Sequence, residues 1–214
     1  MSQDTDAKRK QFYRQLKKLV QPELLSKGFD FDGKRVFRKS VQFDSYTGVQ
    51  IVEFQLGIKS LVGKFTANVG VFSSQFHPND WHPVLNEPLT YDCLPAMTQR
   101  LGFFFDPPQS WIRLVLGHPK PPKYDYWWEQ YADEQKMAQS LQSVLTCLKI
   151  EVLPWLDLLT CREAFEWATS ELARAKRWKE SLGTPGTERY FHLKYYSDIV
   201  QHNAASKAVP PKDF

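Results

Sequence analysis

Residues 50–72 read QIVEFQLGIKSLVGKFTANVGVF, and this stretch decides the fold. Apolar side chains recur at every second position along both arms: Val52, Phe54, Leu56 and Ile58, then Phe65, Ala67, Val69 and Val71. Successive side chains of a strand point to opposite faces, so the pattern predicts an antiparallel hairpin with one buried face. We expect the chain to reverse at residues 60–63, through a loop of two or four residues.

The other side of the same hairpin is polar. It carries Glu53, Gln55, Lys59, Thr66 and Asn68. Antiparallel sheets commonly leave one face to solvent, which is the simplest interpretation of these residues. Side chains on paired strands also lie close enough to converge, and neither Gln55 nor Asn68 is of a type enriched in strands. Glu53, Gln55 and Asn68 are therefore candidates for binding a polar ligand or a partner's backbone.

The flanking segments predict an α+β fold. Residues 5–26 have the apolar spacing of an amphipathic helix, with Pro22 as a kink and Gly28 just past its end. After a turn at Asp32-Gly33, strand patterns cover residues 36–43, 100–105 and 111–116. Helical patterns cover residues 129–153, ending near Pro154, then 160–181, opened by a capping box from Thr160 to Glu163, and 187–202.

This order of elements predicts an N-terminal helix, an antiparallel β-sheet of about five to six strands, and C-terminal helices packed on one sheet face. Residues 1–182 are expected to form a single α+β domain. Residues 183–214 are expected to add a C-terminal helical extension and a loose tail.

Composition narrows the class of protein. The three cysteines, Cys93, Cys147 and Cys161, are odd in number and contain no CxxC spacing, which fits neither a disulfide framework nor a zinc site. The polar start of the chain does not resemble a signal peptide, and no apolar run reaches the ~18 residues of a membrane span. We expect a soluble cytoplasmic protein that has no membrane partner and no cofactor.

Catalytic and metal-binding patterns are weak. His77, Asp80, His82 and His118 fall in proline-rich segments, which hold ligand geometry poorly, so no metal site is expected. The sequence has no nucleophile elbow and no glycine-rich phosphate loop. We therefore assign no catalytic residues and favour a non-enzymatic role.

A further set of motifs consists of Gly28-Phe29, Phe37-Arg38, Gln55, Phe65, Asn68-Val69-Gly70 and Trp127-Trp128. In these motifs the chain resembles the bacterial domain-of-unknown-function family numbered 4304. The resemblance covers roughly residues 10–175. It implies a small α+β domain but no activity and no functional residues. Uncharacterised bacterial domains of this size often prove to be immunity proteins of toxin–immunity pairs. This comparison concerns the class of protein and not particular residues.

Aromatic residues outside the main strands point to protein binding, because Trp and Tyr dominate interaction hot spots. The candidates are Trp81, Trp111, Tyr124, Tyr126, Trp127 and Trp128. The alternative is that these rings cover the sheet or pack under the C-terminal helices. Together with Gln55, Asn68 and Glu53, they are the expected partner-binding residues of an immunity-type protein that neutralises a bacterial toxin by direct binding.

Two other functions stay open. Residues 1–40 contain eleven Lys and Arg against five Asp and Glu, and Lys10, Arg14, Lys17 and Lys18 fall on one side of the first helix. This basic face, with a second one at residues 174–179, could serve an accessory nucleic-acid-binding domain. The polar hairpin face could instead bind a small ligand. The sequence leaves the partner's identity and the oligomeric state open.

Overall fold

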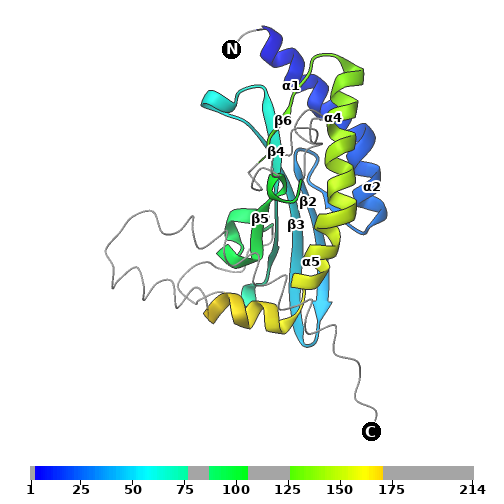
Figure 1. The fold of residues 1–214 in the computed structure, drawn as a ribbon. Coiled ribbons are helices and arrows are strands. Elements are labelled where there is room, and N and C mark those ends of the chain that lie inside the picture. Colours follow the sequence, from blue (N-terminus) through cyan, green and yellow to red (C-terminus); the bar gives the residue numbers. More distant parts are fainter. Residues whose placement is uncertain (1–2, 77–86, 106–125, 171–214) are drawn as a thin grey trace, which may run out of the picture.

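An antiparallel sheet built around the predicted hairpin organises the chain (Figure 1). The computed structural model describes residues 3–76, 87–105 and 126–170 of the 214. Within these residues the strands are β1 (Asp30–Phe31), β2 (Val36–Phe43), β3 (Tyr46–Leu56), β4 (Lys64–Phe72), β5 (Thr98–Arg100) and β6 (Trp128–Glu129). They follow the order β1-β2-β3-β4-β5, and β6 also pairs with β4. The predicted strand 111–116, the helix 187–202 and the boundary at 182 lie outside the described residues.

The hairpin of β3 and β4 confirms the predicted alternation. Val52 lies opposite Val69, Phe54 opposite Ala67 and Leu56 opposite Phe65. All but the half-buried Leu56 are buried in the main core, and Leu56 packs against it. The pairing ends one residue later, where the Gly57 amide donates to the Lys64 carbonyl oxygen over 2.8 Å.

The predictions for the end of this hairpin were wrong. Residues 57–63 form the loop, which contains a 3₁₀ turn at Lys59–Leu61, so the reversal is longer than two or four residues. Ile58 was expected in the core and is 67% exposed. The alternation stops at Leu56 because the chain leaves the strand there, so the position of Ile58 in the repeat no longer determines its burial.

Helices cover one face of the sheet, as predicted. The N-terminal helix consists of α1 (Gln3–Gln15), a π-helical turn (Leu16–Val20) and α2 (Gln21–Ser26). Its Phe12 ring packs on Phe54 and Phe65, with ring centroids 6.2 and 4.9 Å apart. The buried side of α4 (Glu134–Cys147), which includes Met137, Leu141 and Val144, belongs to the same core.

The long C-terminal helix has different ends from those predicted. The Asp133 side chain caps α4 by accepting a hydrogen bond from the Lys136 amide over 2.8 Å, so the helix begins after residue 129. A π-helical turn at Leu148–Val152 then leads into α5 (Leu153–Leu159), so the helix continues past Pro154. The next helical residues are 162–170. The Thr160 hydroxyl donates to the Leu156 carbonyl oxygen over 2.7 Å, back into α5, so the expected capping role of Thr160 was wrong.

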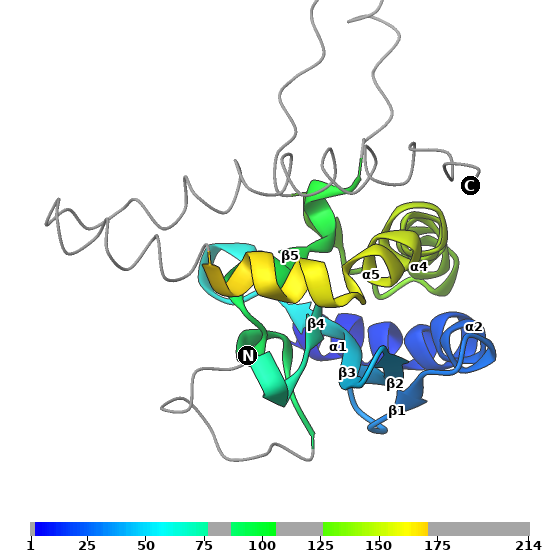
Figure 2. The ribbon, with the colours of Figure 1, turned by 90° about the horizontal axis from the view of Figure 1, so that it is seen from below.

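The second face of the sheet is not left open. A smaller apolar cluster of Val36, Ile51, Phe72 and Cys93 lies there, with Val49 and Leu89 packed against it. Figure 2 shows the helices α1, α2 and α4 on one side of the strands and the turns near residue 90 on the other. The simplest interpretation of this face, a solvated surface, is therefore wrong for its central part.

The predicted strand 100–105 was also wrong: only Thr98–Arg100 pairs with β4, and a 3₁₀ turn follows at Leu101–Phe103.

A buried amide ties the hairpin to the C-terminal helices. Gln50 points toward the helices, where its Nε2 donates to Asp157 Oδ1 over 2.9 Å and to Thr160 Oγ1 over 3.0 Å.

We expect Gln50→Leu to lower the free energy of unfolding by about 1–2 kcal/mol, because these hydrogen bonds are lost in a buried setting. Urea unfolding measures this loss. Gln42→Leu, at an exposed position of β2, is the matched control, and an equal loss in both variants would contradict the assignment.

The β1–β2 turn is held by one carboxylate. Asp32 Oδ1 accepts backbone hydrogen bonds from Lys34, Arg35 and Val36 over 2.7, 2.8 and 3.0 Å, beside Gly33 at φ +80°. Burial, the largest single influence, acts to raise the pKa of Asp32. The three amides and the nearby Arg38 together outweigh it and hold this pKa below its ordinary value.

A carboxylate with a lowered folded-state pKa stabilises the fold above its unfolded pKa of about 3.9, and the effect is lost as the pH falls through the folded value. We therefore expect Asp32→Asn to be less stable than the parent at pH 7, with the difference shrinking below about pH 4. Unfolding in urea across this pH range provides the measurement. Asp30→Asn, which removes the same charge outside the turn, is the control for the loss of charge alone.

Candidate functional site

Three of the residues predicted to bind a partner are connected by an arginine on the second face of the sheet. The Asn68 Nδ2 donates to Gln55 Oε1 over 3.1 Å, and Arg100 Nε donates to Asn68 Oδ1 over 3.3 Å. The Arg100 guanidinium in turn lies over the Trp127 ring, 5.2 Å from its centroid. We call Gln55, Asn68, Arg100 and Trp127 the amide–arginine row. All four side chains are half-buried.

Strand register produces the row. Gln55 lies opposite Thr66 and Glu53 opposite Asn68 in the β3–β4 pair, which places the two amides diagonally on the same face. Arg100 lies directly opposite Asn68 because β5 adds to the free edge of β4. Arg100 was missed by sequence reasoning, since its partner is decided by how the chain returns to β4 after a long excursion.

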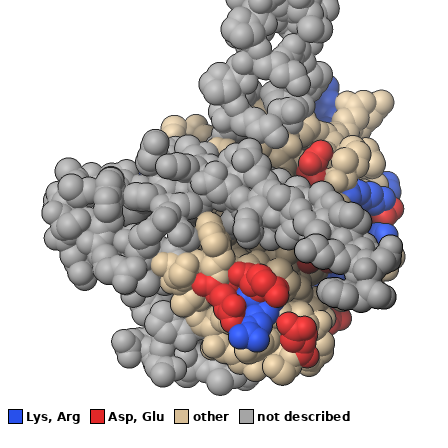
Figure 3. Space-filling model, turned by 60° about the horizontal axis from the view of Figure 1, so that its bottom comes forward, with Lys and Arg blue, Asp and Glu red and all other residues tan. Residues whose placement is uncertain are grey.

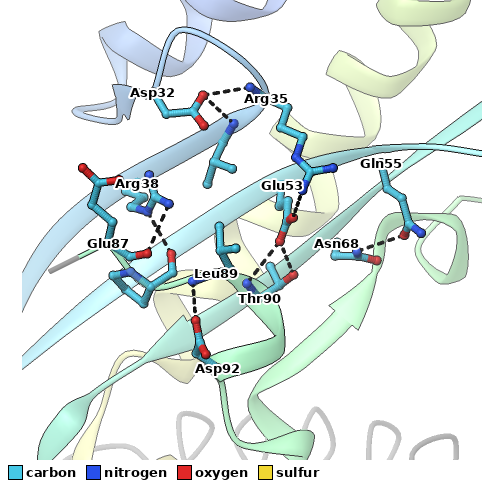
Figure 4. Close-up of polar contacts among 12 residues, drawn as sticks. Asp32, Arg35, Arg38, Glu53, Gln55, Asn68, Glu87, Leu89, Thr90 and Asp92 are labelled. Atoms are coloured by element: carbon cyan, nitrogen blue, oxygen red, sulfur yellow. Dashed lines mark hydrogen bonds and ion pairs between the residues drawn. The ribbon is translucent and has the colours of Figure 1, made fainter. Parts of the chain in front are cut away.

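Glu53, the third polar candidate of the hairpin, is committed to a structural contact (Figure 4). It is 7% exposed, and its Oε2 accepts from the Thr90 amide over 3.3 Å and from the Thr90 hydroxyl over 2.7 Å. Its Oε1 lies 3.4 Å from Arg35 Nη2. The carboxylate therefore anchors residues 87–94, which we call the strap, to the sheet.

Further polar contacts hold the strap. Arg38 Nε donates to the Pro88 carbonyl oxygen over 2.8 Å, and Nη2 reaches the Glu87 carbonyl oxygen at 3.4 Å. Asp92 Oδ2 accepts from the Leu89 amide over 2.8 Å and closes the turn. Together with Glu53, these contacts from β2 and β3 explain why the strap covers this part of the face.

Cys93 lies at the end of the strap. Burial, followed by the charges of Asp92 and Glu53, raises the pKa of this thiol far above its ordinary value. The Cys93 sulfur consequently remains a protonated packing group within the small apolar cluster, and it does not have the thiolate character that a nucleophile needs.

The aromatic candidates separate into two groups. Trp128 is 2% exposed and packs on Phe65 and Phe105, while Tyr126 packs on Phe105 with centroids 4.8 Å apart. These two rings belong to the core or its edge, and Trp128 Nε1 donates to Ser143 Oγ on α4 over 3.3 Å. Trp127 is the one that joins the row. Trp81, Trp111 and Tyr124 lie outside the described residues.

The basic candidates lie on the exposed side of the N-terminal helix. Lys10, Arg14, Lys17 and Lys18 are all exposed. Lys18 forms an ion pair with Glu134 at 3.2 Å, and its hydrogen bond is the main cause that lowers the pKa of Glu134. Part of this stripe is therefore already neutralised. On the face drawn in Figure 3, basic and acidic side chains of the described residues also lie side by side.

Within residues 3–76, 87–105 and 126–170, no cluster of three or more His, Cys, Asp or Glu side chains is placed to hold a metal ion. The candidates His77, Asp80, His82 and His118 lie outside these ranges. None of the helices in the described part of the chain combines the length and apolar character needed to cross a membrane.

The strap anchor can be tested at Thr90. Thr90→Val keeps the shape of the side chain but removes the hydroxyl that donates to Glu53. We expect a loss of about 1–3 kcal/mol in unfolding free energy, because a buried acceptor is left short of a donor. Urea unfolding gives the value, and Tyr91→Ala, at the exposed neighbouring position, should change it little. Equal stability of Thr90→Val and the parent would show that the strap does not depend on this contact.

Comparison with known proteins places the chain in one family. No curated protein and no solved structure matches it. The sequence model of a family described as "Domain of unknown function (DUF4304)" matches residues 20–158, which is more than half of the chain. The resemblance seen in the sequence motifs is thereby confirmed, and the chain belongs to the DUF4304 family.

Proposed function

We propose that this chain is a non-enzymatic protein-binding domain, and more specifically a cytoplasmic, bacterial immunity-type protein that neutralises a toxin by direct binding. The observation that carries the proposal is the amide–arginine row, in which an Arg–Trp pair and two amides lie half-buried on one sheet face. Trp and Arg are enriched among the residues that contribute most to protein–protein affinity.

The row is preorganised. The hydrogen bond to Asn68 and the face of Trp127 together restrict the Arg100 side chain, and Asn68 is itself held by Gln55. A side chain that is already ordered loses less conformational entropy on binding, so more of the contact energy contributes to affinity. Amide side chains beside an Arg–Trp pair also resemble the mixture of apolar centre and polar rim found in protein interfaces.

A binding role also agrees with how the reactive groups near the row are used. The Glu53 carboxylate is occupied by Thr90 and Arg35, and the Cys93 thiol is kept protonated by its raised pKa. Both groups hold the strap in place. Two of the half-buried residues of the row, Gln55 and Asn68, are amides, which recognise polar groups but do not titrate.

The charge of the chain favours some toxins over others. The net charge is +4, and complementary charge assists encounter and suppresses wrong partners. A toxin with an acidic or neutral binding face is therefore the better fit, and a strongly basic nuclease is the poorer one.

Growth rescue tests the proposal. We expect co-expression of the chain with a toxin encoded beside its gene to restore growth and to yield a co-purifying complex. Trp127→Ala should weaken that complex at least tenfold, and Gln139→Ala, on the exposed side of α4, should not. The thermal unfolding midpoint of each variant shows that it remains folded.

Two results would contradict the proposal. One is that no toxin encoded beside the gene is neutralised by the chain or forms a complex with it. The other is binding to DNA or RNA that weakens steeply with salt and depends on Lys10, Arg14 and Lys17, which would favour the nucleic-acid alternative.

A further inference from the structure

The loop between β3 and β4 presents apolar side chains to solvent. In residues 57–63, which we call the knob, Ile58 is 67% exposed and Val62 is 55% exposed. Figure 1 shows this loop extending beyond the rest of the sheet. Single exposed apolar residues are ordinary at protein surfaces, but two on one projecting loop form a local apolar crest.

The knob is a closed structure. Its base is joined by the bond from the Gly57 amide to the Lys64 carbonyl oxygen, and its turn by bonds from Leu61 to Ile58 and from Val62 to Lys59. The Gly63 carbonyl oxygen accepts from the Gln130 amide over 2.7 Å, which fixes the loop to the segment that follows β6. Any Cβ at Gly57 would overlap the Leu61 carbonyl oxygen, so the close packing of the loop requires glycine there.

One residue of the knob has an unfavourable backbone conformation. Lys59 has φ +53°, in the left-handed region that residues other than Gly, Asn and Asp seldom occupy. Hydrogen bonds on either side of it maintain this conformation, and Lys59 lies between the two exposed apolar residues in the sequence. Strain that is kept in an ordered surface loop is often associated with function.

The charge on the knob indicates what it would meet. Lys64 at its base is paired with Glu129 at 3.4 Å, whereas Lys59 is exposed and has no ion pair within the described part of the chain. The crest therefore combines two apolar side chains with one positive charge that no described carboxylate pairs. A complementary surface has an apolar hollow bordered by acidic groups.

We propose that the knob inserts into an apolar, acid-rimmed pocket of the protein partner, beside the contact made by the amide–arginine row. This inference rests on the proposed function and names the chemistry of the partner's surface. Gln55 is three residues from Ile58, about 10 Å along an extended chain, so one partner can cover both features.

A membrane surface fits the knob less well than a protein pocket does. Attraction to anionic lipid contributes about 1 kcal/mol for each basic residue near the surface, and the crest has one such residue that is unpaired. The half-exposed Glu129 beside the base would also be brought toward a negatively charged surface. A preformed closed loop suits a concave site, because little ordering is needed when it binds.

The test uses the full chain and an inactive, purified form of the toxin against which co-expression of the chain restores growth. Calorimetry measures the affinity. We expect the double variant Ile58→Ser and Val62→Ser to bind at least tenfold more weakly than the parent. The matched control is Ile150→Ser, which changes an equally exposed isoleucine (64%) on the C-terminal helix and should bind like the parent.

Two more variants examine charge and shape separately. Lys59→Glu should weaken binding by fivefold or more, and the loss should shrink at high salt, because an acidic rim would repel the new charge. Gly57→Ala leaves every exposed side chain in place but must displace the Leu61 carbonyl. We expect Gly57→Ala to weaken binding, because the proposed insertion depends on the shape of the knob. The circular dichroism spectrum shows that the variant has folded.

The outcomes separate this inference from the proposed function. If Trp127→Ala loses affinity while the Ser double variant binds like the parent, the knob inference is wrong and the protein-binding function stands. If no toxin binds the parent, both are wrong. If the parent binds vesicles of phosphatidylserine and phosphatidylcholine and the Ser double variant does not, the knob is a membrane contact and the inference is overturned.

Discussion

The register of the β3–β4 pair is the constraint on which the rest of the structure depends. Because Phe54 lies opposite Ala67 and Leu56 opposite Phe65, one face of the hairpin is apolar and receives the helices. A shift of one residue would turn this face to the other side and bring Glu53 and Gln55 beneath α1. The same register places Gln55 and Asn68 diagonally on the opposite face, so the core and the two amides of the amide–arginine row have a common origin.

The helices that cover this face are shaped by two prolines in similar surroundings. Pro22 and Pro154 each follow a π-helical turn, at Leu16–Val20 and Leu148–Val152, and each turn begins with Leu-Lys and ends with Val. Proline cannot donate a backbone hydrogen bond and collides with the preceding turn of an α-helix, whereas a wider turn accommodates the ring. The chain consequently stays helical past both prolines. An ion pair between Lys149 and Glu23, with atoms 2.6 Å apart, joins the two helices near these turns.

Local patterns allowed the elements to be predicted where neighbouring residues decide the structure. The alternation of β3 and β4, the residues of β2 and the glycine at φ +84° after the first helix depend on side-chain period or backbone freedom, both visible in a short stretch. The prediction that Pro154 ends a helix failed because packing and the preceding π-turn outweigh the local effect of proline. The strap could not be predicted, since its attachment depends on Thr90 and Glu53, which are 37 residues apart.

The candidate site shows the same division between local and distant causes. Gln55 and Asn68 were found because amides are unusual in strands, and the structure joins them by a hydrogen bond. Trp127 was found by residue type alone, while Trp128 has the same type and lies in the core. The pairing of β6 with β4 sets Trp128 opposite Phe65 on the core face, whereas Trp127 precedes the strand and lies against Arg100.

The polar residues of the hairpin are therefore divided by depth. Gln50 and Glu53, toward one end of the strands, are buried and used to attach the C-terminal helices and the strap. Gln55, two residues closer to the loop than Glu53, and Asn68, directly opposite Glu53, remain half-buried. At the loop end, the hydrogen bond from the Gln130 amide to the Gly63 carbonyl oxygen gives the hairpin a further attachment. These attachments hold in place the surface on which the proposed contact with a partner depends, namely the amide–arginine row and the apolar crest.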